Sequence, residues 1–204
     1  ALSTILMHIL RNNHLHTFAT MNSTQLLKIC HDIILQHSFV VDNYQEALKH
    51  KEKYRHTLKL TNTLELSLTD ELFSIVQVLL TPKQVPSYHS DTKDIQSLPQ
   101  LIMDSIDSCA IDTRAALLEN ICPSGIGSQL LNLPKVLEQT LKCMCSIQQS
   151  KYIKVKADPQ SKDAVWIGGA ILSTLDDFQQ HVQYKEEFLS LLSDVDVDSD
   201  DDDD

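Results

Sequence analysis

Apolar residues recur at helical spacing along most of the chain, and this pattern restricts the fold more than any other feature. Between residues 130 and 145, Leu133, Val136, Leu137 and Leu141 fall on one face of a helix. Such a face has to be buried against another element, so we expect several amphipathic helices packed around a core. The same spacing predicts further helices over residues 1–12, 26–34, 72–80, 98–106, 114–119 and 184–192.

Three short stretches are richer in strand-forming residues. Residues 37–41 and 152–155 each predict a short strand, and the weak alternation of leucines over 56–66 predicts an exposed hairpin. Because helices outnumber these strands, we expect a helix-rich α/β fold. The chain begins at Ala1 within a helical pattern, so we also expect it to be part of a longer chain.

The negative charge is concentrated at one end of the chain. The net charge is −11, and eight aspartates follow Ser193, so the remaining body carries only −11 + 8 = −3. Clustered Lys and Arg are needed to bind phosphates, so this balance argues against direct nucleic-acid binding. We expect the tail, 193–204, to be disordered and solubilising, or to contact a basic partner. The aspartates after Ser193 and Ser199 suit an acid-directed kinase.

The sequence holds no recognisable catalytic or metal-binding motif. Its five cysteines are odd in number and scattered, unlike a disulfide framework, and no apolar stretch approaches about 18 residues. We therefore expect a soluble protein without membrane contact, from a reducing compartment. Cys143 and Cys145 fall on different faces of a helix and lack a second ligand pair, so we expect no metal site. Residue spacing predicts no catalytic residue.

Glycines occur at two places where their effect on the backbone is informative: a turn and the interior of a predicted helix. The segment from Ser124 to Gly127 reads SGIG and is the only glycine-rich turn. It either lets backbone N–H groups approach a phosphate or simply meets the geometry of the turn. Gly168 and Gly169 lie inside a predicted apolar helix, where each costs about 1 kcal/mol relative to Ala. We expect a closely packed backbone there, or a ligand, with Trp166 in the core beside it.

Two segments resemble signatures of the actin family. Residues 164–179 read AVWIGGAILSTLDDFQ, similar to the family's C-terminal pattern, and residues 105–120 read SIDSCAIDTRAALLEN, similar to a second pattern upstream. The order and spacing of the two segments and the SGIG turn also agree with the family. The resemblance is strong over 97–188 and weak over 1–96, and it implies the C-terminal half of an actin-like fold.

The resemblance also implies a division of the chain. Residues 1–96 are a divergent part similar to the family's fourth and third subdomains. Residues 97–192 are similar to the third subdomain returning to the first, and the acidic tail follows from 193 to 204. The family's first phosphate loop and most of its first lobe would lie outside this chain.

The resemblance implies a vestigial nucleotide site. Ser124, Gly125 and Gly127 match the second phosphate-side turn of the family, and Lys162, next to Ser161, falls where the family has an adenine-side lysine. Bound ATP or ADP is therefore expected to be weak, structural or absent.

Three departures from the family argue against turnover at that site. Ile126 replaces a glycine of the turn, and a β-branched residue disfavours positive φ and crowds close approach. Leu131 stands in place of a proline, and Leu35 in place of a glutamate that contacts the nucleotide. We therefore expect no enzyme activity.

The resemblance implies a scaffold or capping subunit. Among actin-related proteins the chain looks most like the one at the pointed end of dynactin, which implies actin-related filament and dynactin pointed-end subunits as partners. That function would support dynein-driven microtubule transport, in the cytoplasm and on the cytoskeleton. The alternatives are an actin-related subunit of a chromatin-remodelling complex in the nucleus, or a nucleotide-hydrolysing actin-like ATPase. The expected partner-binding residues are Trp166, Ile167, Gly168, Gly169 and Phe178.

Overall fold

The computed structural model describes residues 2–14, 18, 21–61, 64–85 and 96–195. The chain forms two compact units, Ala1–Asp163 and Ala164–Asp204. This division does not coincide with the one at 96/97 that the family resemblance implies, which stays a prediction about subdomains. The expected disorder of the tail concerns residues that, from 196 onward, lie outside the described part.

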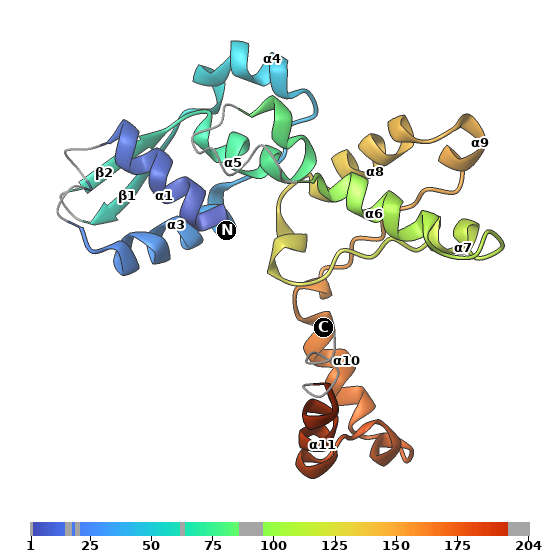
Figure 1. The fold of residues 1–204 in the computed structure, drawn as a ribbon. Helices are drawn as coiled ribbons and strands as arrows, with labels where there is room; N and C mark the ends of the chain where they lie inside the picture. The colour runs from blue at the N-terminus through green and yellow to red at the C-terminus, as the bar shows by residue number, and fades with distance from the viewer. Residues whose placement is uncertain (1, 15–17, 19–20, 62–63, 86–95, 196–204) are drawn as a thin grey trace, which may run out of the picture. The chain divides into compact units, whose positions relative to one another are not determined.

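The first unit is mainly helical, which confirms the helix-rich class (Figure 1). Its elements are α1 (Leu2–Asn13), α3 (Ser23–His37), α4 (Tyr44–Lys49), η1 (Lys51–Tyr54), β1 (His56–Thr61), β2 (Leu64–Leu68), α5 (Glu71–Leu80), η2 (Pro82–Gln84), α6 (Leu98–Asp107), α7 (Arg114–Leu118), η4 (Ile126–Gln129), α8 (Leu133–Met144), α9 (Ile147–Ser150) and η5 (Ser161–Asp163).

Polar side chains set where several of these helices begin. The Asn22 side chain accepts a hydrogen bond from the N–H of Thr24 before α3, and Asn43 does the same for Glu46 in α4. Ser97 accepts from the N–H of Gln100 at the start of α6. Each bond satisfies a backbone donor that the first helical turn leaves without a partner.

The predicted hairpin is confirmed, but its exposure is not. β1 and β2 pair in antiparallel register, with His56 opposite Leu68 and Lys59 opposite Glu65. Leu58 and Leu66 are buried, because one face of the hairpin packs into the core. The hairpin is therefore a structural part of the unit and not an exposed appendage.

The two other predicted strands do not form. α3 continues through His37, and residue 39 of the stretch 37–41 makes only an isolated parallel bridge, to Leu131. Of 152–155, only Val155 is bridged, to Ile121. A strand requires a continuous partner as well as strand-forming residues, and each of these segments finds one bridge.

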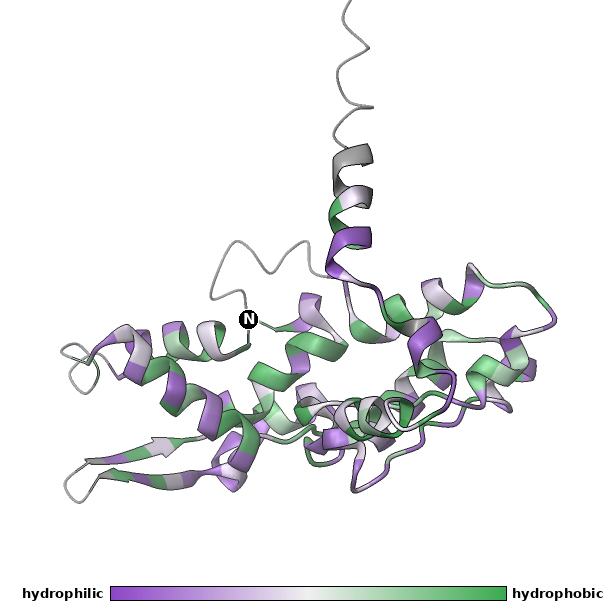
Figure 2. Ribbon diagram, turned by 90° about the horizontal axis from the view of Figure 1, so that it is seen from below, coloured by the Kyte–Doolittle hydropathy of each residue, from purple (hydrophilic) through white to green (hydrophobic). Residues whose placement is uncertain are grey.

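The main core brings together one face of each long helix and of the hairpin. α1 and α3 lie together and both contact α5, which in turn contacts α6, and α6 contacts α8 (Figure 1). Hydrophobic and hydrophilic residues alternate along the ribbons in Figure 2, as expected of helices that are apolar on one side. Fully buried side chains of this core include Leu6, Leu10, Leu26, Leu68, Leu72, Ile75, Leu137 and Leu141.

The leucine stripe of α8 is confirmed, since Leu133, Val136, Leu137 and Leu141 are all buried. In α6, where the apolar spacing predicts that Leu101, Ile102 and Ile106 face inward, the prediction is partly wrong. Ile102 is half-buried against the core. Ile106 is buried, but Leu101 is 49% exposed, and Met103 takes the buried position instead.

The second unit contains α10 (Ala164–Leu172), η6 (Phe178–His181) and α11 (Lys185–Val195). Trp166 does not lie in a core, because it is 76% exposed. The predicted close packing at Gly168 and Gly169 is also wrong, since a Cβ at either position would meet no atom within 4 Å in the described structure. No helix among the described residues is both long and apolar enough to cross a membrane.

Replacing Leu137 with Ala tests the assignment of the core. We expect the free energy of unfolding to fall by about 2–5 kcal/mol, because the side chain is buried and its removal leaves a cavity. Leu101→Ala, the control from α6, is expected to change it by no more than about 0.5 kcal/mol. Urea denaturation of both variants measures the difference, and equal losses would contradict the assignment of Leu101 to the surface.

Candidate functional site

The SGIG turn takes its shape from one glycine. Gly125 has φ 81° and ψ 177°, a conformation that is essentially restricted to glycine, and the short helix η4 begins at the next residue. Ile126 does not share this conformation, because the only other described residue with positive φ is Asn132. The isoleucine therefore causes no backbone strain, contrary to expectation, and its side chain is 43% exposed.

Hydrogen bonds tie this turn to the segment that carries Lys162. The N–H of Gly125 donates to the carbonyl oxygen of Ser161 at 2.9 Å, and the hydroxyls of Ser128 and Ser161 lie 2.7 Å apart. Both serines are buried. The Gln129 amide also donates to both hydroxyls, at 3.2 and 3.3 Å. Two segments more than 30 residues apart in sequence are thereby fixed side by side.

The structure thus brings the four predicted nucleotide-site residues into one region. Ser124, Gly127 and Lys162 are exposed, and Gly125 is half-buried. The N–H of Gly125 already has a protein acceptor, so it does not offer a donor to a phosphate without breaking the bond to Ser161. This bond to Ser161 gives Gly125 a structural role in the turn that requires no ligand.

Among the described residues, no titratable group contacts the hydroxyl pair of Ser128 and Ser161. The partners of Ser128 and Ser161 are each other, the Gly125 carbonyl and Gln129, none of which titrates. Nucleophilic catalysis by serine requires an adjacent base. Burial raises the pKa of the Cys30 thiol to about 11, which also removes this cysteine as a nucleophile. In the described part of the chain no three His, Cys, Asp or Glu side chains are grouped to hold a metal ion.

Leu35, the residue in place of the family's glutamate, lies half-buried on α3, which contacts η4. It supplies no polar group there. Leu131 makes the backbone bridge to Phe39, while its side chain is 72% exposed.

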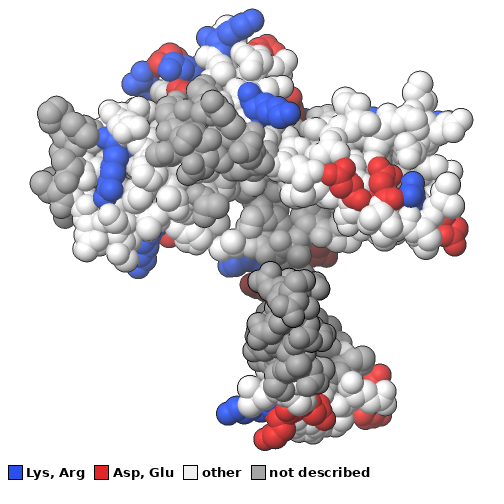
Figure 3. Space-filling view, in the orientation of Figure 1, with Lys and Arg blue, Asp and Glu red and all other residues white. Residues whose placement is uncertain are grey.

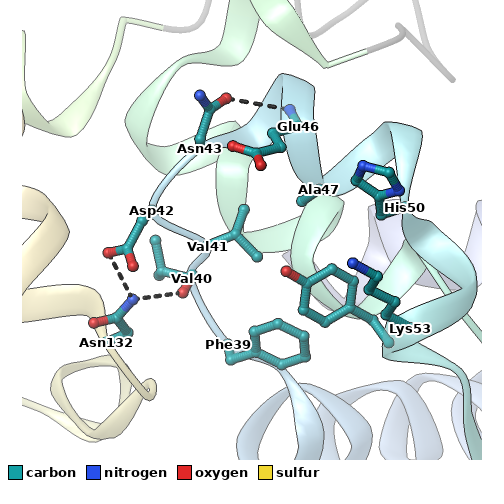
Figure 4. A pocket seen from close by; sticks show the side chains of 11 residues that line it. Phe39, Val40, Val41, Asp42, Asn43, Glu46, Ala47, His50, Lys53 and Asn132 are labelled. Atoms are coloured by element: carbon teal, nitrogen blue, oxygen red, sulfur yellow. Dashed lines mark hydrogen bonds between the residues drawn. The ribbon is translucent and has the colours of Figure 1, made fainter.

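Sequence reasoning missed a hollow of about 390 Å³ beside α4, bordered by 39–43, α4, η1 and Asn132 (Figure 4). Asn132 has φ 69°, and its amide donates to the carbonyl of Val40 at 3.0 Å and to the carboxylate of Asp42 at 3.3 Å. Lys135 also pairs with Asp42, at 2.9 Å. These hydrogen bonds, that of Lys135 first, lower the pKa of Asp42. Asn132, just before α8, is the one sequence signal that marks this corner.

The aromatic floor of this hollow belongs to a second, smaller core. Tyr54 lies 5.6 Å from Phe39 and 5.3 Å from Phe73, measured between ring centroids, and Tyr44 lies 6.0 Å from Phe73. Such distances are typical of favourable aromatic pairs. Besides the rings of Phe39 and Tyr54, the hollow is bordered by Asp42, Glu46 and Lys53, which carry charges of both signs.

The predicted partner-binding residues all lie in the second unit. Trp166, Gly168 and Gly169 are exposed, and Ile167 and Phe178 are half-buried. Val165, Ile171, Leu172 and Leu175 are exposed as well. A helix that is apolar on all sides is normally buried, so within the second unit α10 offers an apolar surface that the other described residues of that unit do not cover.

Comparison with known proteins finds the family described as Actin, matched over residues 4–190. The chain is 32% identical to actin-related protein 4 of Oryza sativa subsp. japonica over 132 residues, which cover 59% of this chain and 29% of the relative. It is 30% identical to actin-related protein 4 of Arabidopsis thaliana over 128 residues, 57% of this chain and 28% of the relative.

A third relative comes from Schizosaccharomyces pombe and is named "SWI/SNF and RSC complexes subunit arp42". The chain is 29% identical to it over 121 residues, which cover 58% of the chain and 28% of the relative. The matched region therefore spans less than a third of the length of these curated relatives.

Alanine substitutions at the two glycines of the turn test whether the positive φ of Gly125 determines its shape. Gly125→Ala is expected to lower the free energy of unfolding by about 1–3 kcal/mol, because alanine is strained at this backbone conformation. Gly127→Ala is the matched control, since it has no positive φ and a Cβ there meets no atom within 4 Å. Chemical denaturation measures both. If the two variants lose the same stability, the positive φ does not determine the turn.

Proposed function

The chain belongs to the actin family, and we propose that it is a non-catalytic actin-related subunit of a chromatin-remodelling complex in the nucleus. The observation that carries the proposal is the set of relatives. Two are named actin-related protein 4, and one is named for the SWI/SNF and RSC complexes. These names favour chromatin-remodelling assemblies over the other settings expected from the sequence.

The geometry supports a binding role more than a catalytic one. The turn at Gly125 is closed by hydrogen bonds to η5, and its buried hydroxyls have no titratable partner. ATP or ADP held near Ser124, Gly125, Gly127 and Lys162 would serve the structure and would not be turned over. The exposed apolar helix α10, by contrast, suits contact with another polypeptide, because protein interfaces have apolar, aromatic-rich centres.

The dynactin pointed-end interpretation predicts different partners and a cytoplasmic location. None of the three relatives described above carries a dynactin name. No described feature of the fold favours filament capping over membership of a remodelling complex. Co-purification with dynactin and steady-state ATP hydrolysis are therefore the two results that would oppose the proposal in the experiment below.

Purification of the full-length protein from its own cells under mild conditions tests the proposal. We expect mass spectrometry to find a remodelling ATPase and its associated subunits with it, and microscopy to find the protein in the nucleus. Co-purification with dynactin subunits and a cytoplasmic location would contradict the proposal. Steady-state ATP hydrolysis by the isolated protein would contradict its non-catalytic part.

A substitution in α10 tests the proposed partner surface. Trp166→Ala is expected to reduce retention in the complex about tenfold or more, because large aromatic side chains at the centre of an interface contribute most of its binding energy. Tyr184→Ala is the control, since Tyr184 is 55% exposed in the same unit and is not among the predicted contacts. Quantitative mass spectrometry of the purified complexes compares them. Equal retention of both variants would exclude Trp166 as a contact.

A further inference from the structure

A groove of about 450 Å³ runs between α3 and the first strand of the hairpin. Five successive residues of β1, His56–Leu60, border it. Successive side chains of a strand point to opposite faces, so a hollow that touches all five lies along the edge of the strand and not over one face. The groove therefore gives access to the backbone of β1.

The backbone at this edge lacks hydrogen-bond partners. Within the described residues the sheet has only two strands, and no backbone group of His56–Leu60 bonds to the protein outside the hairpin. In an antiparallel pair, alternate residues turn their N–H and C=O groups away from the neighbouring strand. Such an edge is a template for one further strand, which is a recurring mode of peptide recognition.

The groove has an apolar floor and a histidine pair at one end. Ile33 and Leu58 are buried in it, and Ile29 on α3 is half-buried. The rings of His37 and His56 lie 5.0 Å apart. Burial, and then the neighbouring His56, lower the pKa of His37. An added strand would thus find apolar contacts on the side of α3.

The chain approaching this edge is basic, although the protein is acidic and Asp32 of α3 borders the groove together with Lys59. Residues 49–59 contain five Lys or Arg and one acidic residue, Glu52, in a chain of net charge −11. Figure 3 shows Lys and Arg gathered over α4 and the segment that follows it. Three of these cations form ion pairs, with Glu52, Glu65 and Asp70. Lys49 and Lys53 form none with the described residues, so a positive excess remains.

We propose that an extended, acidic segment of another subunit adds to β1 as a third strand, in the groove between α3 and the hairpin. The free backbone edge specifies an extended main chain, and the basic residues before it specify acidic side chains. This inference rests on the proposed function, because it requires that the chain work within a multi-subunit complex.

Hydrogen exchange of the full-length protein tests the proposal directly. Exchange of the amides in His56–Leu60 is measured by mass spectrometry in the purified complex and after release of the protein from it. We expect exchange at least about tenfold slower in the complex, because an added strand supplies acceptors for the outward N–H groups. A photo-crosslinking residue at Thr57 is expected to capture an Asp- or Glu-rich peptide of another subunit.

Charge reversal provides a matched pair of variants. Lys59→Glu is expected to reduce the protection at least about threefold, a change in the range of exposed ion pairs. Lys142→Glu, on α8, also reverses a lysine that pairs with a glutamate, and it is expected to leave the protection unchanged. Exchange of the β2 amides in the released protein shows whether the hairpin of each variant remains folded.

Each other outcome overturns the inference. Unchanged exchange in an intact complex would disprove the added strand while leaving the proposed function standing. Failure to isolate any complex would contradict both. Protection that nuclease removes would assign the groove to nucleic acid. A crosslink to β1 of a second copy would assign it to self-association.

Discussion

The burial of α5 is the constraint on which the rest of the first unit depends. Nearly every residue from Glu71 to Leu80 is buried, including the wholly enclosed Phe73. α5 contacts α1, α3 and α6. A helix that is apolar on most sides is stable only when other elements surround it. α5 therefore requires α1, α3 and α6 to pack on it. The hairpin edge, the hollow at Asn132 and the glycine turn are positioned around the core that results.

The features of the fold that could be predicted from the sequence were those specified by neighbouring residues. The stripe of α8 was predicted correctly, because periodicity alone specifies which face is apolar. The pairing of the hairpin was also predicted, but the burial of one of its faces was not. The strand at 37–41 was predicted wrongly, because its only partner is Leu131, about 90 residues away. The exposure of Trp166 could not be predicted either, since an apolar helix is ordinarily a core helix. For the site, the sequence predicted a glycine-rich turn over Ser124–Gly127, but not that Gly125 would have the positive φ. The bond from its N–H to Ser161 and the buried serine pair depend on tertiary contacts that spacing does not encode.

Two surfaces support the proposed role in a multi-subunit complex. One is α10, whose apolar residues are exposed, and the other is the unpaired edge of β1 with basic residues before it. The only region expected to hold a nucleotide is closed by its own hydrogen bonds and lacks a base. In a member of the actin family whose relatives include a subunit of the SWI/SNF and RSC complexes, this combination favours a role in assembly. Affinity would then come from apolar contact at α10, and orientation from backbone pairing at β1.

The most direct measurement of this account is a cryo-electron microscopy structure of the full-length protein within its native complex. The account predicts a remodelling ATPase in the same particle and a second polypeptide covering Trp166 on α10. It would be contradicted by a particle built on a dynactin filament. It would equally be contradicted by a remodelling complex in which Trp166 remains in solvent and the turn at Gly125 opens around a nucleotide that is being hydrolysed.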